Sequence, residues 1–183
     1  MPTPDLAAAR SKRLRDVLAP GLDVVFCGVN PGLWSAAVGH HFARPGNRFW
    51  TALHDAGFTD RLLTPAEDRE LPRWGCGVTN LVARASAAAD ELSRGELARG
   101  ARRLARKLAR YQPRCLAVLG VGAYRTAFAR PHAAVGPQPE TLGGVAVWVL
   151  PNPSGRTAGY RREDFARLFG ELRASLPASR RRR

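Results

Sequence analysis

The sequence predicts an α/β fold: one three-layer αβα domain with a mainly parallel central sheet. Short continuous apolar runs, typical of strands buried on both faces, alternate with segments that have the apolar spacing of amphipathic helices. A chain of 183 residues, 45% of them hydrophobic, is also long and apolar enough for a single compact core. We therefore expect one domain over residues 1–176, with 1–21 as a helical lead-in and 177–183 as a basic disordered tail.

Four apolar runs are expected to form the strands of the sheet. They are residues 22–27, 76–82 with its exit loop, 115–119 and 145–150. Gly28 allows the backbone to turn at the end of the first run. Gly143-Gly144 predicts a two-residue hairpin turn before the last strand.

Helix caps as well as apolar spacing mark the predicted helices. Asn47 is a candidate N-cap, and Thr64 combines a capping box with a proline in a short helix that Pro72 limits. Ser93 opens a capping box and a longer amphipathic helix, the polar face of which carries Arg99, Arg102, Arg103, Arg106 and Arg110. The ordinary interpretation of such a run is a solvated helix face. Two more amphipathic helices are expected before residue 22 and over 165–176.

Two asparagine-bearing loops follow strand-like runs that lie far apart in the sequence. Gly28-Val29-Asn30-Pro31-Gly32 follows the first run, and Pro151-Asn152-Pro153-Ser154-Gly155 follows the last. Each segment alone reads as an ordinary turn, since Asn, Pro and Gly are common turn residues. In a parallel sheet, however, both loops leave the same edge, where open α/β sheets place their ligands. We therefore expect the polar groups of these two loops to converge on one crevice.

The strongly basic composition indicates a polyanionic partner. The formal net charge is +14, and the arginines at 180–183 supply only four of these charges. Binding to nucleic acid would then depend strongly on salt. The alternative is a general bias towards arginine, because Lys12 and Lys107 are the only lysines.

Several function classes are not indicated by the composition. No apolar run is long enough to span a membrane and no signal pattern opens the chain, so a cytoplasmic location is expected. Cys27, Cys76 and Cys115 include no Cys-x-x-Cys pair and read as buried thiols, too few for a four-cysteine iron–sulfur cluster. The histidines cluster only as His40-His41, and we expect no metal and no cofactor.

Four motifs in order give the chain a family resemblance. They are GVNPGLWSA at 28–36, HFARPGNRFW at 41–50, GVTNLV at 77–82 and LPNPSG at 150–155. The chain resembles the mismatch-specific uracil-DNA glycosylase family, the bacterial relatives of thymine-DNA glycosylase, from about residue 22 to residue 176. The resemblance implies the fold of the uracil-DNA glycosylase superfamily. It also implies a monomeric, monofunctional DNA repair enzyme that flips uracil out of a G·U mismatch in double-stranded DNA and leaves an abasic site. Ethenocytosine and other damaged pyrimidines are further expected substrates.

The resemblance also implies roles for individual residues. Asn30 would position the attacking water through its amide oxygen, and the base would be bound by Val29, Ser35, Phe42, Asn80 and Asn152. The DNA wedge and phosphate contacts would come from Ser154, Gly155, Arg156 and Arg161. Asn30 and Asn152 replace the Asp and His of faster relatives, so we expect a slow enzyme without the roughly 10²- to 10⁴-fold contribution of a general base.

Two other function classes remain open from the sequence. A non-catalytic basic nucleic-acid-binding protein on the same fold is favoured by the arginine surplus and by the lack of Asp or His in the two central loops. A nucleotide-binding oxidoreductase would depend only on Gly120-Val121-Gly122, where Arg125 replaces the third glycine of the dinucleotide motif.

Overall fold

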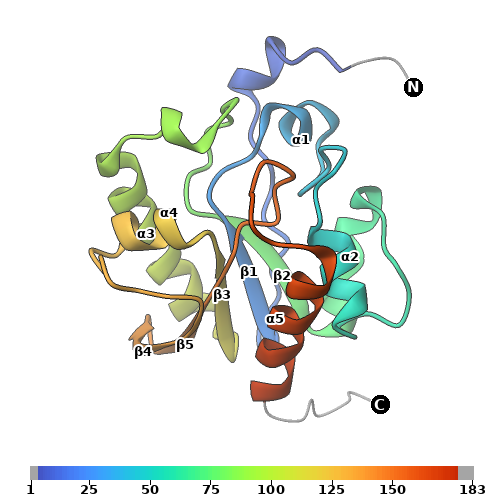
Figure 1. The fold of residues 1–183 in the computed structure, drawn as a ribbon. Coiled ribbons are helices and arrows are strands. Elements are labelled where there is room, and N and C mark those ends of the chain that lie inside the picture. The colour runs from blue at the N-terminus through green and yellow to red at the C-terminus, as the bar shows by residue number, and fades with distance from the viewer. Residues whose placement is uncertain (1–3, 177–183) are drawn as a thin grey trace.

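The computed structural model describes residues 4–176 and contains one five-stranded sheet (Figure 1). The strands are β1 (Val24–Gly28), β2 (Cys76–Asn80), β3 (Cys115–Leu119), β4 (Gly136–Leu142) and β5 (Val145–Leu150). Their order is β2-β1-β3-β5-β4, and all neighbouring pairs are parallel except the β4–β5 hairpin. The predicted α/β class with a mainly parallel sheet flanked by helices is confirmed.

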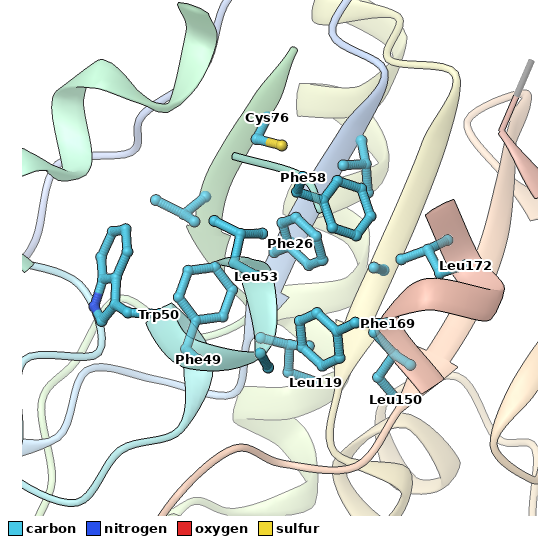
Figure 2. Close-up of a cluster of buried hydrophobic side chains, with 14 of the residues drawn as sticks. Phe26, Phe49, Trp50, Leu53, Phe58, Cys76, Leu119, Leu150, Phe169 and Leu172 are labelled. Carbon is cyan, nitrogen blue, oxygen red and sulfur yellow. The ribbon is translucent and has the colours of Figure 1, made fainter. Parts of the chain in front are cut away.

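One face of the sheet is covered by α2 (Phe49–Asp55), α5 (Arg162–Ser175) and the 3-10 helix η2 (Pro65–Trp74) (Figure 1). Large aromatic side chains fill this layer (Figure 2). The Phe26 ring lies 5.4 Å from the Phe49 ring, edge to face, and is stacked 5.7 Å from the Phe169 ring. Phe26 therefore connects β1 to both helices through contacts that add to the burial of apolar area.

The other face is covered by α3 (Arg94–Tyr111) and α4 (Val121–Ala127). Leu104 and Leu108 of α3 pack against β-strand residues such as Val25 and Leu116. Ser93 caps α3 by accepting a hydrogen bond from the Glu96 amide at 3.2 Å, as the capping box predicts. The sheet is thus buried on both faces, which explains why its strands read as continuous apolar runs.

Several elements differ from the sequence-based expectations. From residue 4 onward, the N-terminal lead-in contains one 3-10 turn, η1 (Ala8–Ser11), in place of the expected amphipathic helix. It then runs extended, because Val17 forms an antiparallel bridge with Val78 on the outer edge of β2. The helix after Thr64 is a 3-10 helix that continues past Pro72 and ends where Gly75 adopts a left-handed conformation. Its capping box with Glu67 is present as predicted.

Four elements were not expected as such. They are α1 (Leu33–Val38), the short 3-10 helix η3 (Ala89–Glu91), α4, and β4 as a full strand. β4 contains Pro137 and Pro139, residues that argue against a central strand but are tolerated on an edge strand such as this one. The predicted basic tail at 177–183 lies outside the described residues. Within those residues, no helix is both long and apolar enough to cross a membrane.

The three cysteine thiols are buried and free, as predicted. Burial raises the pKa of Cys27 and Cys76 far above that of an exposed thiol, and it raises the pKa of Cys115 to about 11. These thiols act as small apolar core residues.

Two glycines inside helices provide a test of how closely α3 approaches the segment that follows β2. A Cβ on Gly100 would lie against the carbonyl oxygen of Leu81, whereas a Cβ on Gly170 of α5 would meet nothing within 4 Å. We expect Gly100→Ala to destabilise the protein by about 1–3 kcal/mol through overpacking. Gly170→Ala should stabilise it by about 0.5–1 kcal/mol, because alanine favours a helix. Urea denaturation of both variants measures this difference, and equal effects would contradict the close approach of α3 to Leu81.

Candidate active site at the carboxyl edge of the sheet

The three asparagines singled out from the sequence lie at the same edge of the sheet. Asn80 is the last residue of β2 and is in register with Gly28, the last residue of β1. Asn30 and Asn152 each lie two residues beyond the end of a parallel strand, β1 and β5 respectively. The carboxyl ends of the parallel strands therefore bring the two asparagine-bearing loops to one edge.

The side chain of Asn30 is held by its amide nitrogen. Nδ2 donates to the Arg84 carbonyl oxygen at 3.0 Å, the Pro31 carbonyl oxygen at 3.2 Å and Ser86 Oγ at 2.7 Å. Carbonyl oxygens only accept hydrogen bonds, so the NH₂ group must face them. Oδ1 is left without a partner in the described part of the chain, and Asn30 thus presents an acceptor oxygen.

Asn152 is held in the opposite sense. Its Oδ1 accepts a hydrogen bond from the Ser154 amide at 3.0 Å, a local turn that fixes the side chain. Because an amide N–H can only donate, Oδ1 must occupy this position. Nδ2 donates to no residue from 4 to 176, so Asn152 presents a free donor.

Val29 and Asn152 lie close together over the end of β3. Val29 Cγ2 and Asn152 Cβ are both within 4 Å of the point where a side chain on Gly120 would begin. Gly120 has a φ of +132° and opens α4, which the sequence suggested only as an incomplete dinucleotide loop. Its missing side chain leaves room for the loops after β1 and β5 to meet.

Gly28 makes room for Asn80 and Phe42 in a similar way. A Cβ on Gly28 would lie 2.6 Å from Asn80 Oδ1 and 3.4 Å from the Phe42 ring. The Asn80 amide makes no hydrogen bond to the described residues, so its donor and its acceptor are both available. The Phe42 ring and the unpaired Asn80 amide thus both lie next to Gly28, which has no side chain to keep them apart.

Phe42 is held in an uncommon backbone conformation. Its φ is +53°, a left-handed value that costs a bulky residue on the order of 1–3 kcal/mol. One side of the ring stacks on the buried Phe49 at a centroid distance of 4.1 Å. The next residue, Ala43, donates its backbone N–H to Ser35 Oγ at 3.0 Å, so the contact that this structure gives Ser35 is with the Phe42 loop.

A buried histidine and a buried aspartate hold the start of the same loop, a role that sequence reasoning did not predict. The His41 backbone N–H donates to Asp68 Oδ2 at 3.0 Å, and the His41 ring donates from Nε2 to the Arg15 carbonyl oxygen at 2.9 Å. Burial lowers the pKa of His41, because the charged ring would lose its hydration. Asp68 comes from η2, so it connects that helix to the Phe42 loop.

Arg48 organises the loop after β5, and sequence reasoning missed it as well. Its guanidinium donates to three carbonyl oxygens of that loop, those of Ser154 (2.7 Å), Thr157 (2.9 Å) and Tyr160 (2.7 Å). It also lies 4.5 Å above the centre of the Phe165 ring. A single side chain thus fixes the path of residues 154–160.

The residues expected to contact DNA lie in and just after this loop. Arg156 is exposed and reaches across to the Ala87 carbonyl oxygen at 3.2 Å, while its backbone N–H donates to Ser154 Oγ at 3.3 Å. A Cβ on Gly155 would lie 2.9 Å from the Gly46 carbonyl oxygen, so only glycine fits there. Arg161 is exposed at the start of α5, where its backbone N–H donates to Asp164.

The chemistry offered at this edge is that of neutral amides. Within residues 4–176, no group of three or more His, Cys, Asp or Glu side chains lies together as metal ligands. Two surface hollows of about 450 and 330 Å³ lie elsewhere, one beside Asp68 and the N-terminal segment and the other beside β4. The candidate site is defined by its unpaired amide groups and the Phe42 ring.

Two comparisons with known proteins bear on the family and the fold of this chain. A sequence model of the Uracil DNA glycosylase superfamily matches residues 15–173. Among solved structures, a solution NMR structure of a "putative Uracil DNA glycosylase" from Methanosarcina acetivorans aligns with a TM-score of 0.55. The identity is 18%, and the alignment covers 88% of this chain and 98% of that chain. At this identity the structural match establishes the fold alone.

The role of Arg48 can be tested with a substitution that keeps the positive charge and removes the planar guanidinium group. Arg48→Lys retains the cation but loses the fork that reaches three carbonyl oxygens, and each bond to a charged group is worth about 1.5–3 kcal/mol. We expect backbone amides in 152–160 to exchange with solvent faster, as measured by hydrogen-exchange mass spectrometry. Arg44→Lys is the matched control, because Arg44 is exposed and no structural hydrogen bond of its side chain is seen in the described region. Unchanged exchange in Arg48→Lys would contradict this role.

His41 should make stability depend on pH. In the folded state its pKa is below the usual value of about 6.5, so on acidification the unfolded chain takes up a proton that the folded chain does not. Stability should therefore fall as the pH drops below about 6.5, with a slope of up to about 1.4 kcal/mol per pH unit. Urea denaturation between about pH 7 and pH 5 should show a shallower slope for His41→Gln than for the control His132→Gln. Parallel profiles for the two variants would rule out His41 as the source.

Proposed function

This chain belongs to the Uracil DNA glycosylase superfamily, whose members hydrolyse uracil from DNA, and we propose that it is a monofunctional, mismatch-specific member. Its substrate would be uracil opposite guanine in double-stranded DNA, with ethenocytosine or other damaged pyrimidines as further substrates. The product would be an abasic site in an uncut strand, and the enzyme would act as a monomer without a cofactor.

The observation that carries the proposal is the opposite orientation of two amides at one edge. Asn30 is anchored through nitrogen and presents an oxygen, while Asn152 is anchored through oxygen and presents an N–H. Breaking the glycosidic bond gives the sugar positive character and the leaving base negative character, so the reaction needs a held water and a hydrogen-bond donor. In this proposal Asn30 Oδ1 orients the water and Asn152 Nδ2 stabilises the departing base.

Phe42 and Asn80 would bind the flipped base. One side of the Phe42 ring is covered by Phe49, which braces it so that a base can stack on the other side. The Asn80 amide has both an acceptor and a donor to offer, which match the N3–H and O4 edge of uracil. Val29 would contribute to the base site from the loop after β1, and Ser35 would act through the Phe42 loop that its hydroxyl holds.

The neutral amides also explain a preference for mismatches. An amide cannot accept a proton from water at neutral pH, so the roughly 10²- to 10⁴-fold contribution of a general base is absent. A slow chemical step requires that the base spend longer in the site, and a mispaired base costs less to extrude than a well-paired one. We therefore assign the specificity for mismatches to slow cleavage of the glycosidic bond combined with the lower free energy needed to flip a mispaired base.

The loop after β5 would contact the DNA next to the flipped base. The bond from Arg156 to the Ala87 carbonyl oxygen is a single contact at the surface, so the guanidinium can exchange it for the vacated space, the orphaned guanine or a phosphate. Ser154, Gly155 and Arg161 would support this contact. Arg48 would keep the loop in place while Arg156 moves.

A strand-cleavage assay tests the proposed activity. A labelled duplex with one G·U mismatch is incubated with excess enzyme and treated with hot alkali, which cuts at abasic sites. We expect single-turnover cleavage that is faster at G·U than at A·U. We expect Asn30→Ala to abolish cleavage with duplex affinity largely retained, and the control Gln138→Ala, on β4 away from the asparagine loops, to cleave normally. Binding without cleavage of G·U or ethenocytosine duplexes would instead support the non-catalytic nucleic-acid-binding alternative.

Asn30→Asp extends the same assay. A carboxylate at this position would turn one oxygen towards the carbonyl oxygens of Pro31 and Arg84, where the amide now donates. We therefore expect Asn30→Asp to fall short of the gain of about 10²- to 10⁴-fold that a general base can contribute. A gain of that size would show that the surroundings of Asn30 do not require an amide.

A further inference from the structure

Five arginines form a stripe along the outer side of α3. Arg99, Arg102, Arg103, Arg106 and Arg110 are all exposed. At 3.6 residues per turn they lie within an arc of about 100°, and at 1.5 Å per residue the stripe is about 16 Å long. We call these five residues the α3 stripe. It lies on the layer opposite α2 and α5 (Figure 1).

Within the described residues, no arginine of the α3 stripe forms a salt bridge. Glu96, the acidic residue of α3, forms a salt bridge with Arg84 of the preceding loop. Arginines elsewhere on the surface do have acidic partners, such as Arg162 with Asp55 and Arg61 with Glu67. The positive charges of the stripe therefore remain uncompensated at close range.

A general bias towards arginine does not account for the stripe. α3 and α5 are the long helices on the two faces of the sheet, and such a bias would act on both. α3 has seven basic residues and one acidic residue, whereas α5 has three of each. The surplus of charge is local to α3, which points to a partner for that surface.

The stripe leads away from the candidate active site. The start of α3 lies near the carboxyl edge, where Glu96 pairs with Arg84 of the loop that holds Asn30. The other end lies at the opposite edge of the sheet, where the Tyr111 carbonyl accepts a hydrogen bond from Gly21, just before β1. A duplex seated across the asparagine-bearing edge would therefore not follow the stripe along its length.

We propose that the α3 stripe is a second DNA-binding surface, which binds the phosphate backbone of a duplex segment other than the one that carries the damaged base. Guanidinium groups bind phosphate oxygens through paired hydrogen bonds. A stripe about 16 Å long exceeds the major groove width of about 12 Å, so its two ends can reach the phosphate rows on both sides. The proposal rests on DNA as the partner of this superfamily and not on which base the enzyme removes.

Charge-matched variants test this surface. Arg102→Gln/Arg103→Gln/Arg106→Gln removes three charges from the stripe, and Arg73→Gln/Arg167→Gln/Arg173→Gln removes three exposed charges from η2 and α5. Affinity for a long undamaged duplex is measured over a range of salt concentrations. We expect the slope of log K against log salt to become shallower by up to about 2.7 for the stripe variant, from about 0.9 per lost phosphate contact. The control variant should keep nearly the wild-type slope, and circular dichroism checks that both fold.

The number of duplexes bound per protein shows whether the α3 stripe is a separate DNA-binding site or part of the one at the asparagine loops. In sedimentation with an excess of duplexes of about 15 base pairs at low salt, roughly 1.5 helical turns each, we expect two duplexes per wild-type protein and one per stripe variant. Single-turnover cleavage of a short G·U duplex at saturating enzyme should be the same for both. A single duplex per wild-type protein, equal slopes for the two triple variants, or tighter binding of duplex RNA than of duplex DNA would overturn the proposal.

Discussion

The orientation of two asparagine side chains depends on backbone carbonyl and amide groups that cannot change their role. The carbonyl oxygens of Pro31 and Arg84 oblige Asn30 to face them with nitrogen, and the Ser154 N–H obliges Asn152 to face it with oxygen. The two ends of a neutral amide carry no net charge that would orient it, so hydrogen bonds from the surrounding backbone must set which end faces outward. The carboxyl edge of the parallel sheet places both asparagines where this can be done, and the site follows from that constraint.

The loops around these amides are held by charged groups that take no direct part at the edge. Asp68 binds the backbone before Phe42, and Arg48 binds the backbone after Asn152. Both groups satisfy main-chain atoms that a loop cannot satisfy by itself. The structure therefore uses these two side chains to hold the loops, while the uncharged amides of Asn30 and Asn152 each keep one atom unpaired within the described residues.

The sheet and the asparagine loops could be predicted from the sequence because both depend on local patterns. Apolar runs predicted β1, β2, β3 and β5. In a parallel sheet, Asn30 and Asn152 were therefore expected at one edge, and the structure places them there. β4 was hidden by its prolines, which only its position at the edge of the sheet makes acceptable. Arg48 gave no local signal either, because its partners lie 106 to 112 residues away along the chain.

The buried cysteines have a consequence for the way the protein responds to oxidants. Peroxides attack the thiolate form of cysteine, and burial keeps Cys27, Cys76 and Cys115 in the thiol form. Cys27 lies in β1 immediately before Gly28, so a sulfenic acid there would disturb the strand that carries the Asn30 loop. Burial of the three thiols thus makes the core tolerant to peroxides.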